Sequence, residues 1–113
     1  MATGRLGSVN MTAATNTSVY ICPATTFAVA TVSICNRSNS SITARVAIST
    51  NVTTFPTPPV PTLDEWIEWD VEILPKGVLE RTGLVLDAGK NLVVYTSTAN
   101  VSVMAFGIET PTA

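Results

Sequence analysis

Apolar and polar side chains alternate along much of this chain with a period of two, which is typical of strands that bury one face. In residues 42–49 the apolar residues at alternate positions are Ile42, Ala44, Val46 and Ile48. Helical spacing of apolar residues is nearly absent, and β-branched residues are common throughout. The pattern therefore predicts an all-β protein.

Turn-forming residues divide the chain into short segments. A kink at Gly83 is expected to split one of these segments into a strand pair. Before residue 18 we expect a loose start and after residue 108 a polar tail, so both ends are expected to be flexible. About eight antiparallel strands predict one domain, a β-sandwich or jelly roll, because a single flat sheet would leave a hydrophobic face in water. The expected strands are 18–22, 27–36, 42–49, 64–73, 78–85, 91–97 and 101–108.

Residues 55–61 contain four prolines, which exclude a central strand or a helix because proline lacks the amide hydrogen and fixes φ. We expect a stiff extended loop that crosses between two sheets. A docking arm for a neighbouring protein is the alternative. The candidate interface residues in this loop are Phe55, Pro58, Pro59 and Val60.

The stretch from Trp66 to Ile73 carries the densest pattern of aromatic and acidic residues. Strand periodicity puts Ile67, Trp69, Val71 and Ile73 on one face. It puts Trp66, Glu68, Asp70 and Glu72 on the other, and we take these four as candidate interface residues.

The three carboxylates of that second face could hold calcium or act as an acid and base pair. We favour a simpler role, in which they keep the strand soluble, prevent edge-to-edge aggregation or meet a basic patch on a partner. Trp66 is a stacking platform for a sugar, an anchor for a partner or a core residue.

Only 12% of the residues are charged, which is about half the usual share, and the mean hydropathy is +0.37. A surface with so few charges is either rich in hydroxyl groups or covered by partners. We therefore expect the protein to self-associate into a homo-oligomer at neutral pH.

The composition also excludes several functions. The chain has no histidine, which removes the commonest general base and metal ligand, and its glycines do not have the spacing of a phosphate-binding loop. A net charge of −2 and a pI near 4.8 argue against nucleic acid, and no apolar run approaches the ~20 residues of a membrane span. We expect no enzymatic activity, no cofactor and no metal.

Cys22 and Cys35 are the only two cysteines. The first residues lack the charged and apolar regions of a signal peptide, so we expect a protein made in the cytoplasm, where disulfides are rare. Both cysteines are therefore expected to be small buried apolar residues, with a disulfide as the alternative.

Six short motifs are similar to those of small virion structural proteins of tailed bacteriophages, including phages of cyanobacteria. In the C-terminal half they are Ile67-Glu68-Trp69-Asp70, Leu74 to Gly83 and Ser97 to Val103. In the N-terminal half they are Val19 to Ala24, Ser33 to Arg37 and Ala44 to Ser49.

This resemblance implies a β-sandwich in the virion, made in the host cytoplasm. The expected function is a capsid decoration (cement) protein that binds and stabilises the capsid lattice, or a component of the tail, baseplate or fibre attachment. The expected partners are the major capsid protein or tail proteins, and further copies of this chain, for which a trimer would suit quasi-threefold capsid positions. A carbohydrate-binding module, with Trp66 and the acidic residues as its site, is the alternative from another class.

Overall fold

Two antiparallel four-stranded sheets make up the protein. The computed structural model describes residues 3–53 and 57–112. The elements of these residues are β1 (Thr3–Asn10), β2 (Thr17–Ile21), β3 (Thr26–Asn36), β4 (Ile42–Ser49), the 3₁₀ helix η1 (Leu63–Glu65), β5 (Trp66–Ile73), β6 (Val78–Leu86), β7 (Asn91–Thr96) and β8 (Val101–Pro111).

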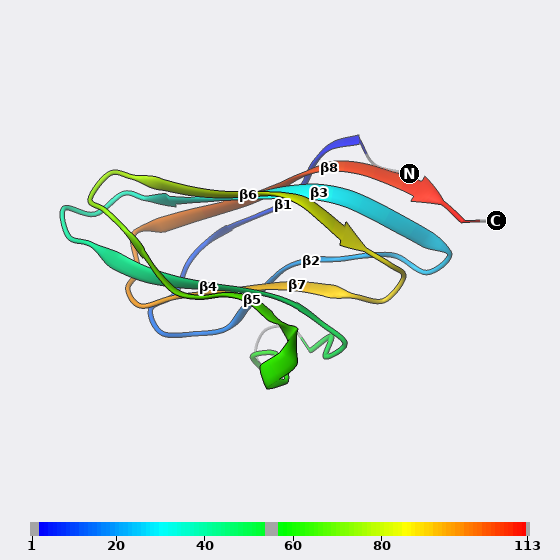
Figure 1. Cartoon of the computed structure of the whole chain (residues 1–113), viewed down its shortest axis with the longest axis horizontal. Helices are drawn as coiled ribbons and strands as arrows, with labels where there is room; N and C mark the ends of the chain where they lie inside the picture. Colours follow the sequence, from blue (N-terminus) through cyan, green and yellow to red (C-terminus); the bar gives the residue numbers. More distant parts are fainter. Residues whose placement is uncertain (1–2, 54–56, 113) are drawn as a thin grey trace.

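The strand order is β1-β8-β3-β6 in the first sheet and β2-β7-β4-β5 in the second, and the two sheets face each other (Figure 1). The pairing is nested, because β1 pairs with β8, β2 with β7, β3 with β6 and β4 with β5. Eight strands paired in this way and folded into two sheets form a jelly roll. The prediction of an all-β sandwich or jelly roll of about eight strands is confirmed.

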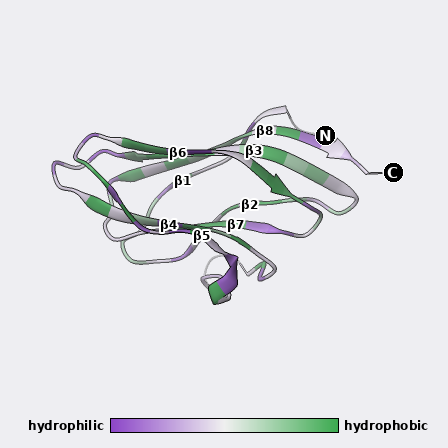
Figure 2. Ribbon diagram, viewed as in Figure 1, coloured by the Kyte–Doolittle hydropathy of each residue, from purple (hydrophilic) through white to green (hydrophobic). Residues whose placement is uncertain are grey.

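The core is one layer of aliphatic side chains between the sheets. Hydrophobic residues follow the strands of both sheets (Figure 2). The alternation in β3 and β4 points every second side chain inward, as the sequence predicts. Fully buried residues of this layer include Ala28, Val32, Ile34, Ala44, Val46, Leu86, Leu92, Val94, Val101 and Ala105.

Both ends of the described chain lie in strands, so the expected loose start and polar tail are wrong there. Strand β1 pairs with β8 from Thr3, opposite Ile108, to Asn10, opposite Ser102. A Cβ atom at Gly7 would clash with the carbonyl oxygen of Val19. Glycine is therefore required where β1 passes close to β2, although it is a weak strand former and hides the strand in the sequence.

The segment 78–85 is a single strand and not a strand pair. In the ladder between β3 and β6, Ala30 pairs with Leu84 and Val32 with Arg81, so two residues of β6 lie opposite one of β3. Gly83 lies in this bulge with a φ of 70°, a conformation that glycine adopts without strain. The kink that the sequence indicates is therefore a bulge.

A buried hydrogen bond joins the two sheets. The Tyr20 hydroxyl on β2 donates to Oε2 of Glu109 on β8 at 2.5 Å. Burial, together with the bond to Glu109, raises the pKa of Tyr20. The nearby Cys22 is buried as expected, its thiol pKa is raised by the same burial, and both cysteines are free thiols.

We predict that Tyr20→Phe destabilises the protein by about 1–3 kcal/mol, because the buried carboxylate of Glu109 loses a donor. The measurement is urea unfolding at pH 7. Tyr95→Phe is the control, because the Tyr95 hydroxyl makes no hydrogen bond with the described residues. Equal losses in both variants would contradict the prediction.

Candidate interaction surfaces

The outer side of the β2-β7-β4-β5 sheet carries a cluster of aromatic rings around Arg45, which we call the Arg45 cluster (Arg45, Trp66, Trp69, Asp70 and Tyr95). The Arg45 guanidinium carbon lies 3.8 Å from the centre of the Trp69 ring and 4.4 Å from that of Tyr95. Its Nε donates to Oδ1 of Asp70 at 2.6 Å. Trp66 meets Trp69 edge to face, with ring centroids 5.4 Å apart. Arg45 is thus held by two rings and a carboxylate.

A bulge in β5 builds this cluster. Ala44 pairs with Val71 and Val46 with Glu68, so Trp69 and Asp70 lie together opposite Arg45. Asp70 has a φ of 51°, which is uncommon for a residue with a side chain. Between the bulge and the start of β5 the predicted alternation is wrong. Trp69 was expected on the same face as Val71, but 53% of the Trp69 surface is exposed.

The same bulge separates the three carboxylates that were expected on one face. Glu68 accepts a 2.9 Å hydrogen bond from Nη1 of Arg81, on the edge of the other sheet, whereas Asp70 binds Arg45. Glu72 is exposed opposite Thr43. No group of three potential metal ligands exists among residues 3–53 and 57–112. The geometry of these carboxylates therefore does not support the hypothesis of a calcium site or of an acid and base pair.

The proline-rich segment lies against the outer side of the same sheet (Figure 1). It joins β4 to β5, which are neighbours in one sheet, so the expected crossover between sheets is wrong. Pro59 is buried and its carbonyl accepts a 3.0 Å hydrogen bond from Nδ2 of Asn16. Of the other candidate residues there, Pro58 and Val60 are exposed, and Phe55 lies outside the described residues.

Pro59 and Pro61 of this segment are buried, and so are two outward side chains of the sheet beside it. Ala47 and Val93 pair across β4 and β7 and are fully buried, although they lie outside the core layer between the sheets. We take the described part of the segment, residues 57–61, as a cover over this side of the sheet, and its bond to Asn16 means that it is not a free arm.

Glu65 fastens the end of this cover to the end of β4. Its carboxylate accepts hydrogen bonds from the Ser49 hydroxyl at 2.7 Å, from the Thr50 amide at 3.0 Å and from the Thr62 amide at 3.0 Å. These donors lower the pKa of Glu65 to about 2. Glu65 is not among the predicted site residues, although Thr62 followed three residues later by Glu is a capping-box signature.

The outer side of the β1-β8-β3-β6 sheet has no such cover. We call it the apolar sheet face, because large hydrophobic side chains lie on it with 36–60% of their residue surface exposed. Val29 pairs with Val85 on one side and with Ile108 on the other, so these three make a continuous apolar row across the sheet. The exposed hydrophobic residues of this face are Val29, Val78, Val85, Met104, Phe106 and Ile108.

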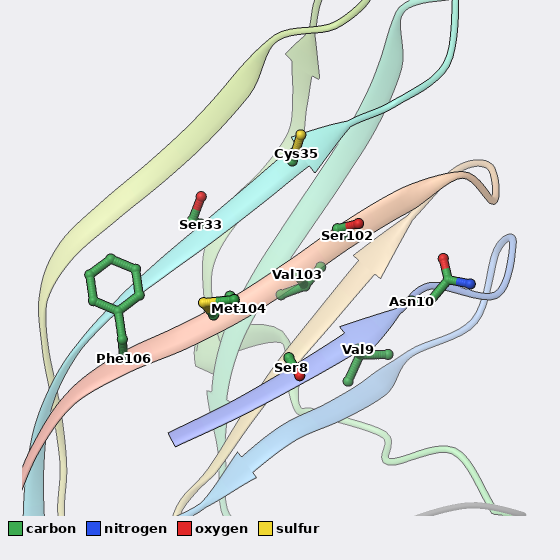
Figure 3. A pocket seen from close by; sticks show the side chains of 9 residues that line it. All are labelled: Ser8, Val9, Asn10, Ser33, Cys35, Ser102, Val103, Met104 and Phe106. Atoms are coloured by element: carbon green, nitrogen blue, oxygen red, sulfur yellow. The ribbon is translucent and has the colours of Figure 1, made fainter. Parts of the chain in front are cut away.

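An open hollow of about 460 Å³ lies in this face (Figure 3). Serine side chains and the half-buried Cys35 form much of its lining, with Met104 and Phe106 beside them. No carboxylate or amine lines it. Cys35 was expected in the core and lies instead on the outer side of β3, opposite Ser102.

The apolar sheet face was not among the predicted interaction sites. Two strands of this sheet carry apolar residues on both faces, which is typical of strands covered on both sides. In β8 the inward Val103 and Ala105 alternate with the outward Met104 and Phe106. That two-sided pattern was the available signal.

No family model, no curated protein and no solved structure matches this chain. In the part of the chain that the structure describes, no helix has the length and apolar character needed to cross a membrane.

We predict that Glu65→Ala lowers the free energy of unfolding by about 1–2 kcal/mol. The loss is no larger because this carboxylate is partly exposed and water screens its interactions. Because its pKa is lowered from 4.5 to about 2, Glu65 stabilises the fold above pH 4.5, and the effect disappears as the pH falls towards 2. Thermal unfolding between pH 2 and pH 7 measures this. Glu72→Ala, at an exposed carboxylate, is the control. A loss that is independent of pH would contradict the assignment.

Proposed function

We propose that this protein is a non-enzymatic structural protein of a bacteriophage virion. In this proposal it is a capsid decoration (cement) protein that binds the major capsid protein and stabilises the capsid lattice. The observation that carries the proposal is the apolar sheet face, which lies outside a core that is already complete without it. Exposed apolar patches of this kind mark sites of protein association.

Three further features support an assembly role. The jelly roll is a fold that capsid domains use, although a fold alone does not establish a function. The hollow in the apolar sheet face is lined by serine, cysteine and apolar side chains and by no carboxylate, so it suits an uncharged protein surface. The motifs noted in the sequence are similar to those of phage virion proteins.

The Arg45 cluster is a second contact surface in this proposal. Tryptophan and arginine are the residues that most often anchor interfaces. Arg45 is already held between two rings, so little side-chain entropy remains to be lost when a partner covers it.

A carbohydrate-binding module is the second candidate, favoured by the exposure of Trp69 beside Asp70. Sugars bind to tryptophan by stacking on the ring face. One face of Trp69 is already covered by the Arg45 guanidinium, and Trp66 packs against the same ring. The geometry therefore favours a protein partner over a sugar.

The proposal is tested on particles of the phage that encodes this chain. We expect the protein in purified virions, with jelly-roll density on the outer capsid surface in cryo-EM maps. Particles that lack the protein should lose their DNA at lower temperature, and added purified protein should restore their stability. Density at the tail or baseplate, with normal heat stability of the heads, would assign the tail alternative. Absence from every purified particle would overturn the proposal.

A glycan array distinguishes a carbohydrate-binding module from an assembly protein. We expect no binding by the wild-type protein and none by Trp69→Ala. Glycan binding that Trp69→Ala abolishes, with unchanged unfolding of the variant, would favour the carbohydrate-binding module.

A further inference from the structure

We infer that the apolar sheet face binds a second copy of this chain, face to face, around a twofold axis parallel to the strands. The inference deepens the proposed assembly function and rests on it for its biological setting. The size, the shape and the charges of the face all fit a second copy.

The face is large enough for a stable dimer. Four strands about 4.8 Å apart and a central strand of eleven residues, at about 3.3 Å per residue, make a face of about 700 Å². A standard protein interface buries about 800 Å² on each partner. The apolar row of Val85, Val29 and Ile108 lies across this face.

The shape of the face is self-complementary. A twofold axis parallel to the strands places β8 of one copy over β3 of the other, because these two strands lie at the centre of the sheet. The outward residues of β8 are large where their cross-strand partners on β3 are small: Met104 pairs with Ser33, and Phe106 with Thr31. The same axis therefore lays Met104 of one copy over Ser33 of the other.

That position is where the face is hollow. Ser33, Ser102 and Ser8 line the open hollow, and their small side chains leave room there (Figure 3). The Met104 side chain of a second copy would enter this space, and the reciprocal contact would form on the other side of the axis. An interface in which both copies use the same patch requires this kind of match.

The charges of the face are also self-complementary. Among the described outward residues of its strands, the charged ones are Arg5 on β1 and Glu80 on β6, the two opposite edges of the sheet. Arg5 lies in register with Phe106, and Glu80 with Ser33. Neither side chain makes an ion pair or hydrogen bond within the described residues.

The proposed axis brings these charges together. It places β1 of one copy over β6 of the other, with Arg5 and Glu80 offset by two residues along the strand, or about 7 Å. An arginine side chain can span that offset. Two reciprocal ion pairs would then flank an uncharged centre, and like charges would not meet.

Sedimentation equilibrium of the full chain tests the inference. We expect wild type at twice its 11.9 kDa mass in the micromolar range. Ile108→Glu should weaken the dimer at least about tenfold, because an unpaired carboxylate would be buried at its centre. Ile67→Glu is the matched control, since Ile67 is also exposed but lies on β5 of the other sheet. Circular dichroism checks that both variants are folded.

The charge pair and Cys35 give independent readouts. Arg5→Glu and Glu80→Arg should each weaken the dimer by up to about fivefold, and the double variant should restore it. The thiol of Cys35, on the same face, should react more slowly with a thiol reagent as protein concentration rises. A wild-type monomer at high concentration, a trimer, or a dimer disrupted by Ile67→Glu and not by Ile108→Glu would overturn the inference.

These outcomes are distinguishable from failure of the proposed function. If the chain dimerises through this face but is absent from every virion, the phage role is refuted and the inference stands. If the chain is a virion protein and its density shows this face against the capsid shell with no second copy on it, only the inference is refuted.

Discussion

The nested pairing of the first half of the chain with the second half is the constraint on which the rest of this structure depends. Each of the first four strands finds its ladder partner in the last four, so the aliphatic layer between the sheets is complete only when both halves are in place. Such long-range pairing has a high entropic cost that only burial of the whole layer offsets. The bulges at Gly83 and Asp70 lie on β6 and β5, the edge strands where an extra residue disturbs the fewest neighbours.

The few charges of the chain serve mainly to hold this arrangement together. Arg81 and Glu68 tie the edge of one sheet to the edge of the other, Arg45 and Asp70 stabilise the bulge in β5, and Lys90 and Asp87 close a turn. Arg37 donates to the side-chain oxygen of Asn10 at the end of β1, and Lys76 donates to the backbone carbonyl of Arg37. Arg5 is left as the one basic side chain without a partner among the described residues, which is why its place on the apolar sheet face carries weight.

Alternation of apolar and polar residues was sufficient to predict the sandwich, because β3 and β4 keep a regular period in the structure. It failed where tertiary contacts override that period. Strand β1 escaped notice because Gly7 is set by the close approach of β2. Trp69 was placed on the wrong face because the bulge at Asp70 depends on Arg45 across the ladder. Of the predicted interface residues, Pro59 and Glu68 form hydrogen bonds within the chain. The apolar sheet face was not predicted.

The two outer faces of the sandwich differ in a way that points to association. On the β2-β7-β4-β5 sheet, the outward Ala47 and Val93 are buried within the chain, and the proline-rich segment packs on this side with Pro59 and Pro61 buried. The fixed φ of proline lowers the entropy that such packing costs. On the other sheet, Val29, Val85 and Ile108 remain exposed at positions where threonine would satisfy the ladder equally well. The fold gains no core packing from these outward aliphatic side chains. Only a surface from outside the chain could bury them. In our proposal that surface is the same face of a second copy, because the face has a hollow under the proposed axis and opposite charges on its opposite edges.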